Sequence, residues 1–74
     1  MTFDMKPVQS SQIALVGYSE PDKVLRIAFT RNAAYQYFPV EKSVYDELMA
    51  SDSIGSYFSQ HIKGNENYKC TKIS

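Results

Sequence analysis

The sequence predicts a single α+β domain in which a three-stranded antiparallel β-meander is followed by two short helices packed on one face of the sheet. Three observations support this prediction. Short turns separate the apolar runs of the first half, which is typical of neighbouring antiparallel strands. Apolar residues of the second half follow helical spacing instead. The length of 74 residues corresponds to one small domain.

The first strand is expected at residues 13–16, which are continuously apolar. Such a run is typical of a strand with both faces at least partly covered. Simple alternation would place either Ile13 and Leu15 or Ala14 and Val16 on the face turned away from the helices. That open face is therefore a candidate surface for self-association or partner docking.

Two further strands are expected at residues 24–29 and 34–38. The first of these alternates apolar and polar side chains clearly, and it follows a turn containing Pro21 and Asp22. Asn32 lies in the next reversal, where it accepts a left-handed backbone more readily than most residues. A chain reversal this short predicts that the two strands are adjacent and antiparallel.

Tyr35 and Tyr37 lie on the same face of the third strand, and two interpretations are open. In one, the rings form a wall of the core. In the other, they form an exposed platform on which nucleic-acid bases stack. The simplest register places Gln36 opposite Arg26 on the outer face, which favours the core interpretation.

The first helix is expected to begin at Glu41 or Ser43 and to end at Ala50. Its apolar residues recur at i and i+4 and form one stripe. Ser43 followed by Asp46 resembles a capping box at the helix start, with Asp in place of the usual Glu.

The second helix is expected at residues 54–62, where apolar residues recur at i, i+3, i+4 and i+8. Ser53 is the candidate cap, and Gly55 is expected to let the helix approach the sheet near the tyrosines. Gly64 ends the helix. The tail contains a possible short C-terminal strand, and residues 1–9 and 66–74 are expected to be flexible or weakly ordered.

Composition narrows the functional classes. Lys plus Arg equal Asp plus Glu at eight each, which counts against strong non-specific nucleic-acid binding, although the C-terminal end is mildly basic. Cys70 and His61 are each the single residue of their kind, so we expect no disulfide, no metal site and no cofactor. The first residues lack a signal-peptide pattern and no run is long enough to span a membrane, so we expect a cytoplasmic protein with no membrane partner.

The segments SSQI, VGY, VLRIAF, YQYF, VYDELM and SIGSYFSQHI together resemble the KTSC domain family. This small bacterial domain is named for its occurrence at the C-terminus of some lysyl-tRNA synthetases and also occurs as a free-standing protein. The resemblance covers about residues 10–63. Its most specific parts are the Tyr-x-Tyr motif at Tyr35 and Tyr37 and the Gly-x-Tyr-Phe motif at Gly55, Tyr57 and Phe58.

The chain departs from the family pattern at two places. Alanines stand at positions 33 and 34, where a glycine often precedes the tyrosine motif, and Glu41 and Lys42 stand where prolines are common. These departures affect turn and cap geometry. The resemblance implies the same fold, and it implies RNA binding through the association with the synthetase.

We expect a small non-enzymatic domain that binds tRNA-like RNA weakly, through the open sheet face and the basic C-terminal end. Arg26, Arg31 and Gln36 are expected to lie together on that open face. The alternative is a protein–protein interaction or homodimerisation module that uses the open sheet face, since the neutral charge favours a protein partner. No catalytic residues are expected. The structural core motif comprises Tyr35, Tyr37, Tyr57 and Phe58. The candidate binding residues are Arg26, Arg31, Gln36, Ser53, Gly55, His61 and Lys63.

Overall fold

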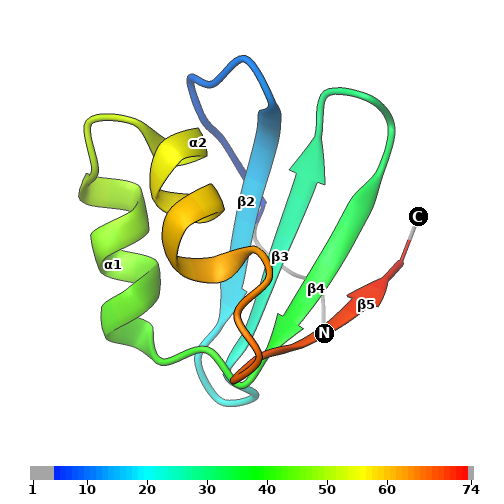
Figure 1. The fold of residues 1–74 in the computed structure, drawn as a ribbon, viewed down its shortest axis with the longest axis vertical. Coiled ribbons are helices and arrows are strands. Elements are labelled where there is room, and N and C mark those ends of the chain that lie inside the picture. The colour runs from blue at the N-terminus through cyan, green and yellow to red at the C-terminus, as the bar shows by residue number, and fades with distance from the viewer. Residues whose placement is uncertain (1–4, 74) are drawn as a thin grey trace.

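Five antiparallel strands form one sheet in the order β1-β2-β3-β4-β5 (Figure 1). The structure is a computed structural model and describes residues 5–73, so the ends at residues 1–4 and 74 lie outside the described residues. The strands are β1 (Lys6–Pro7), β2 (Ile13–Ser19), β3 (Val24–Phe29), β4 (Ala34–Phe38) and β5 (Lys69–Lys72). The helical elements are α1 (Lys42–Ala50), α2 (Ile54–Tyr57) and a π-helical turn η1 (Phe58–Ile62) that continues α2.

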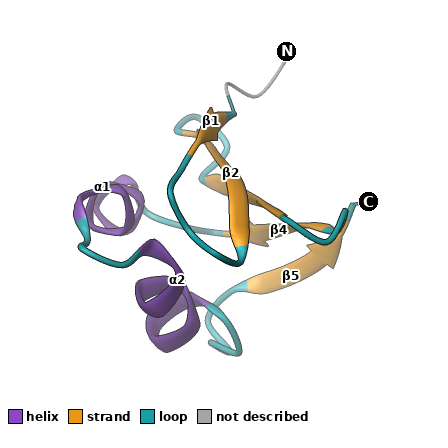
Figure 2. Ribbon diagram, turned by 90° about the horizontal axis from the view of Figure 1, so that it is seen from above, coloured by secondary structure: helices purple, strands orange, loops and turns teal. Residues whose placement is uncertain are grey.

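Both helices lie on one side of a twisted sheet (Figure 2), so the predicted α+β class is confirmed. The prediction described fewer strands, because β1 was not anticipated. That strand has two residues, one of them a proline, and it lies at an edge of the sheet where a missing N–H is tolerated. The C-terminal strand is present as β5, and it pairs with β4 along its four residues.

The register between β3 and β4 is the predicted one. Arg26 lies opposite Gln36, and Leu25 lies opposite Tyr37. Directly opposed residues of antiparallel strands share a face, so the tyrosines lie on the helix side and the Arg26–Gln36 pair lies on the open face. Tyr37 is buried with 5% exposure, whereas Tyr35 is only partly buried against the core.

A β-bulge in β2 contradicts the simple alternation expected for this strand. Ile13 lies opposite Phe29, but Leu15 lies opposite Ala28, so the register shifts at Ala14. The extra residue turns Ile13 and Val16 to the same face, and both are fully buried. Neither expected pair is exposed on the open face, and β2 also extends to Ser19, beyond the apolar run.

The capping box expected at Ser43 is absent. Helix α1 begins at Lys42 with Glu41 as its N-cap, so Ser43 lies inside the first turn, where its side chain is not in the capping position. Asp46 instead forms an i,i+4 ion pair with Lys42, whose Nζ donates to Asp46 Oδ2 at 3.1 Å.

The second helix has the expected cap and the expected end. The Ser56 backbone N–H donates to Ser53 Oγ at 3.3 Å, and Gly64 has a positive φ of 74°. Its last turn widens into a π-helix, in which the Lys63 N–H donates to the Phe58 carbonyl at 2.8 Å. Gly55 was expected to lie near the tyrosines. It lies against Ser10 instead, where a β-carbon on Gly55 would approach the serine Oγ to 3.2 Å.

Phe58 joins the helices to the sheet. Its ring packs edge to face against Phe29 and against Tyr37, with 5.5 Å between ring centroids in both pairs. Such edge-to-face pairs are favourable beyond the area they bury. Phe58 is 2% exposed, and it lies beside the fully buried Leu25 and Ile27 in the same core cluster.

We predict that Phe58→Ala lowers the free energy of unfolding by about 3–5 kcal/mol, because the substitution leaves a cavity against two aromatic partners. This loss is a large part of the stability of a small domain. Urea denaturation followed by circular dichroism measures the change. Phe38→Ala is the matched control, since Phe38 is 46% exposed on the open face. A loss below about 1 kcal/mol for Phe58→Ala would contradict this account of the core.

Candidate functional site

Aromatic side chains line a groove between strands β4 and β5 and the loop that follows η1. The volume of this aromatic groove is about 510 Å³, which is within the range of small-molecule sites. Its non-aromatic lining comprises Lys63, Gly64, Asn65 and Cys70. Its aromatic lining comprises Phe29, Tyr35, Tyr37, Phe58 and Tyr68.

A second hollow, here called the basic groove, lies at the end of the sheet near the β3–β4 turn. Its volume is also about 510 Å³. Arg31 and Lys63 are its two cationic side chains, and Phe29 and Tyr35 are shared with the aromatic groove. The remaining lining residues are Ser11, Gln12, Thr30 and Ala33.

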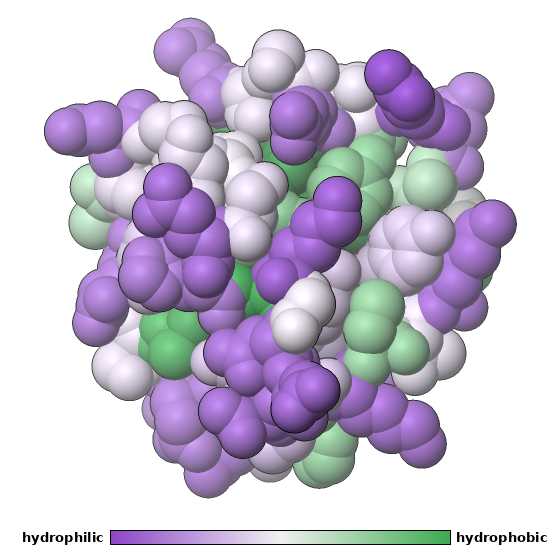
Figure 3. All heavy atoms as spheres, in the orientation of Figure 1, coloured by the Kyte–Doolittle hydropathy of each residue, from purple (hydrophilic) through white to green (hydrophobic). Residues whose placement is uncertain are grey.

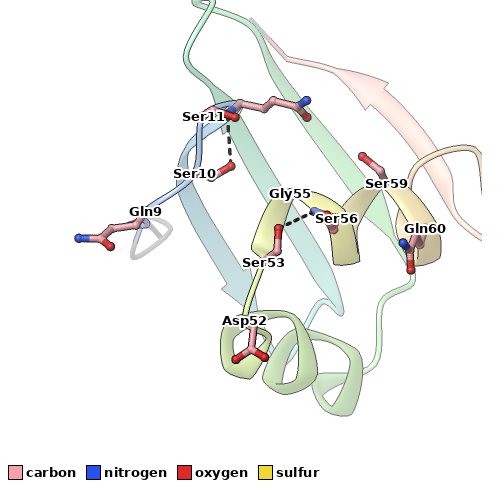
Figure 4. A pocket seen from close by; sticks show the side chains of 10 residues that line it. Gln9, Ser10, Ser11, Asp52, Ser53, Gly55, Ser56, Ser59 and Gln60 are labelled. Carbon is pink, nitrogen blue, oxygen red and sulfur yellow. Dashed lines mark hydrogen bonds between the residues drawn. The ribbon is translucent and has the colours of Figure 1, made fainter.

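A third hollow, here called the hydroxyl groove, has a volume of about 300 Å³. Figure 4 shows that its side chains come from two segments, with Ser10 and Ser11 in the chain that leads into β2 and Ser53, Ser56 and Ser59 along α2 and η1. Asp52 is its one charged residue. The other lining residues are Gln9, Gln12, Gly55 and Gln60.

The three grooves follow one another around the second helix. The hydroxyl groove shares Ser11 and Gln12 with the basic groove, and the basic groove shares Phe29, Tyr35 and Lys63 with the aromatic groove. A ligand longer than one groove would therefore meet mostly neutral polar groups with one carboxylate, then cations, then aromatic rings.

The cations of the basic groove are not neutralised by carboxylates. Within residues 5–73 the salt bridges join Lys23 to Glu41 and Lys42 to Asp46, and neither involves Arg31 or Lys63. Neither the aromatic nor the basic groove is lined by an acidic residue in the described part of the chain. Lys72 adds a further cation, because it lies opposite Tyr35 on β5 and so on the same face.

The surface on the helix side is mixed. The space-filling view of this side (Figure 3) shows apolar surface between hydrophilic side chains, and not one broad apolar patch. Side chains of this kind suit a ligand that is partly planar and apolar and partly charged, more than a flat apolar partner surface.

Tyr37 forms the floor of the aromatic groove opposite Cys70 in the β4–β5 register. Burial raises the pKa of the Tyr37 hydroxyl well above its usual value, and the neighbouring Cys70 thiol raises it further. The phenol therefore remains protonated at physiological pH and offers a neutral O–H group to the groove.

The structure divides the predicted binding residues between two faces. Arg31, Ser53, Gly55 and Lys63 line the connected grooves on the helix side. Arg26 and Gln36 lie on the opposite face, where Arg26 Nε donates to Gln36 Oε1 at 3.1 Å. Arg31 does not join them on the open face as expected, because the β3–β4 turn carries it to the groove shared with Lys63.

His61 is separate from both groups. It lies on η1, exposed, with its ring 4.4 Å from that of Tyr57 between centroids, and it lines none of the three grooves. The Tyr57 hydroxyl donates to Glu47 on α1 at 3.0 Å. These contacts link the two helices and give His61 a packing partner.

Sequence reasoning missed Tyr68 and Asn65 as site residues, because both lie in a loop without regular spacing. It treated Cys70 as part of a tail, whereas the residue lies on β5 and lines the aromatic groove. The polar–apolar alternation from Tyr68 to Cys70 is the signal that indicates a strand here. Phe29 follows the apolar alternation of residues 24–29, but its place at the shared wall of two grooves depends on tertiary packing.

Residues 5–73 contain no group of three or more His, Cys, Asp or Glu side chains placed to hold a metal ion. In the same residues, no helix is both long and apolar enough to cross a membrane.

The chain is thus a small α+β domain with a five-stranded sheet, helices on one face and connected grooves at the sheet end. The KTSC domain family model matches residues 9–68. The chain belongs to the KTSC domain family, which confirms the resemblance found in its sequence.

Relatives of similar length share the whole domain. A protein of Tsukamurella paurometabola is 37% identical over 59 residues, which cover 80% of this chain and 88% of that protein. A protein of Stutzerimonas stutzeri is 34% identical over 66 residues, covering 89% and 92% of the two chains. The crystal structure of a KTSC domain protein from Yersinia pestis has a TM-score of 0.92 at 33% identity and covers 99% of this chain and 100% of that one.

A lysine–tRNA ligase of Nostoc punctiforme is 29% identical over 69 residues. The match covers 93% of this chain but 12% of the ligase. The domain is therefore similar to one short segment of a much longer enzyme.

We predict that the stability of the folded domain decreases as the pH rises above about 10, the usual pKa of a tyrosine in an unfolded chain. Burial raises the pKa of Tyr37, Tyr18 and Tyr57 in the folded state. Above the unfolded pKa the unfolded chain loses protons that the folded chain retains, so the free energy of unfolding falls. Urea denaturation at a series of pH values from 8 to 11 (about three units around the tyrosine pKa) measures the slope.

Tyr37→Phe is the matched variant, since it keeps the ring and removes the ionising hydroxyl. Its stability should decrease less steeply over the same alkaline range. Equal slopes for the variant and the original chain would contradict the role assigned to burial of Tyr37.

Proposed function

We propose that this chain is a small non-enzymatic domain that binds RNA weakly, through the connected grooves on the helix side of the sheet. The observation that carries the proposal is the junction of the aromatic and basic grooves, where Phe29 and Tyr35 meet Lys63, with Arg31 beside them. Aromatic rings stack on bases and cations attract phosphates, and RNA offers both groups in each nucleotide.

The charge distribution supports weak binding more than tight binding. The formal net charge is zero, so there is no long-range attraction of the kind that drives strong non-specific binding. The attraction is local, because Arg31 and Lys63 lack carboxylate partners within residues 5–73. Binding should therefore combine a small salt dependence with a stacking contribution of about 1–3 kcal/mol per base.

The comparisons give independent support. The Nostoc relative that shares this domain is named as a lysine–tRNA ligase, so in that protein the domain belongs to an enzyme with a tRNA substrate. This supports tRNA as the first ligand to test for the present chain. It also supports the cytoplasmic location expected from the sequence, which stays a prediction.

We predict that labelled tRNA and single-stranded RNA bind this domain at micromolar concentrations in about 20 mM salt and more weakly in about 200 mM salt. Lys63→Ala should reduce the affinity by about threefold to tenfold, because it removes one phosphate contact and one wall of both grooves. Fluorescence anisotropy measures both effects.

Lys69→Ala is the matched control. It removes the same charge from β5, but Lys69 lies opposite Phe38 and so on the open face. The ratio of the RNA affinities of the two variants separates a local contact from a change in net charge. Equal losses of RNA affinity for Lys63→Ala and Lys69→Ala would contradict the groove as the binding site. An absence of binding at tens of micromolar protein in low salt would contradict RNA binding altogether.

A second candidate function is self-association through the open sheet face. Leu15, Ala28 and Ala34 form a partly buried aliphatic row across this face, and Phe38, at the other end of β4, is 46% exposed. Apolar side chains left exposed or partly exposed on one sheet face are typical of a surface that docks against another protein. We propose a second copy of this chain as the occupant to test first.

We predict that, if this face mediates dimerisation, sedimentation at increasing protein concentration shows a dimer that Phe38→Ala abolishes. Gln12→Ala, on the helix side, should leave the dimer unchanged and serves as the control. A strictly monomeric species at high concentration would contradict self-association. Phe38→Ala should leave RNA affinity unchanged, because the proposed RNA site lies on the other side of the sheet.

A further inference from the structure

We infer that the connected grooves form a track for a short single strand of RNA, with one unstacked base in the aromatic groove, its phosphate at the basic groove and a neighbouring nucleotide along the hydroxyl groove. This inference rests on the proposed function and adds the form of RNA that the site accepts. It predicts a preference for single strands over duplexes and for RNA over DNA.

The aromatic groove favours an unpaired base. Its rings come from both the sheet and the loop after η1, so a ligand must enter between two elements and not lie on a flat surface. Tyr35 and Phe29 already pack edge to face at 5.8 Å between centroids, which leaves the partly buried Tyr35 ring as a wall of the groove. A base inside an A-form duplex is stacked on both sides and does not fit such a slot.

The position of the cations matches the covalent order of a nucleotide. Lys63 lines both the aromatic and the basic groove, so a phosphate held by Lys63 and Arg31 lies next to a base held by the aromatic rings. Asp52 lies in the hydroxyl groove and disfavours a phosphate there. Charge thus directs the phosphate to the middle of the track.

The hydroxyl groove supplies the chemistry that distinguishes ribose from deoxyribose. Apart from Asp52 its lining side chains are neutral. The side chains of Ser59 and Gln60 are exposed and make no hydrogen bond to another residue within residues 5–73. Hydroxyl and amide groups both donate and accept hydrogen bonds, as a 2′-hydroxyl does. Ser53 is left out of the test, because its Oγ accepts from the Ser56 N–H and caps the second helix, so that its substitution would also change helix stability.

The site size follows from these assignments. A track of one base groove, one phosphate groove and one polar groove accommodates about two to four nucleotides, the lower end of the range for single-strand binding sites. Affinity should therefore rise from a mononucleotide to a tetranucleotide. It should change little with further length, apart from the statistical increase that comes from the larger number of positions at which the domain can bind a longer strand.

The test is a fluorescence anisotropy series on the full 74-residue chain. The probes are a mononucleotide, oligouridylates of increasing length, the matching oligodeoxyuridylates, and a blunt RNA duplex. The expected result is saturation of affinity near four nucleotides, with at least about fivefold weaker binding of the duplex and of the deoxy strand.

Two variants test the assignments separately. The double variant Ser59→Ala with Gln60→Ala should reduce RNA affinity by about threefold to tenfold and leave DNA affinity nearly unchanged, as the loss of one or two hydrogen bonds implies. Thr71→Ala is the matched hydroxyl control, because Thr71 lies opposite Gln36 on the open face.

Iodoacetamide tests the aromatic groove. It should weaken RNA binding by the original chain, since exposed Cys70 lines this groove, but it should not affect RNA binding by Cys70→Ser.

The outcomes separate this inference from the proposed function. No binding of any oligonucleotide overturns both. Two results would overturn the single-strand track and leave RNA binding in place. One is equal affinity for duplex and single-stranded RNA. The other is a ratio of RNA affinity to DNA affinity that is the same in the double variant as in the original chain.

Discussion

The pairing of Arg26 with Gln36 across β3 and β4 is the constraint on which the rest of the structure depends. Side chains alternate between the two faces of a strand, so a slip by one residue would turn Tyr35 and Tyr37 away from the helices. The polar pair on the open face and the aliphatic residues Leu25 and Ile27 on the other face both oppose such a slip. With the register set, the aromatic rings meet the second helix.

The same aromatic residues that stabilise the domain also line the aromatic groove. Phe58 and Tyr37 are buried in the core, yet each contributes a surface to the aromatic groove together with Phe29 and Tyr35. A small domain has few large side chains beyond those that its core needs, so the proposed binding surface is the edge of the core itself. Rigid packing of the inner rings then fixes the outer ring edges, which reduces the entropy lost when a planar ligand stacks there.

The net charge of the chain is zero, but its charged side chains are distributed unevenly over the fold. Glu41 and Asp46 are paired with lysines near α1, whereas Arg31 and Lys63 at the end of the sheet have no such partner within the described residues. The π-helical turn connects Lys63 to the core, because its final hydrogen bond runs from the Lys63 N–H to the carbonyl of the buried Phe58. That bond holds the backbone of the cation that both grooves share.

The amino-acid sequence alone determined the α+β class, the three central strands, both helical segments and the family, because each depends on local spacing or on short motifs. It also favoured the inward direction of the tyrosines over an exposed platform, since Arg26 and Gln36 indicate the outer face, and the structure confirms this direction. The sequence predicted the helix caps less well. Ser53 caps the second helix as expected, but Ser43 does not cap the first helix, because the N-cap of that helix is Glu41, two residues earlier.

Only the tertiary structure decided which residues form the site. Tyr68, Asn65 and Cys70 reach the tyrosines through β5, whose pairing with β4 joins segments more than thirty residues apart, as in Phe38 with Lys69. The bulge at Ala14 overrode the alternation of the first strand, and the β3–β4 turn carried Arg31 to Lys63. Local spacing specifies elements, whereas the contacts between distant elements depend on how the whole chain packs, and the grooves lie at those contacts.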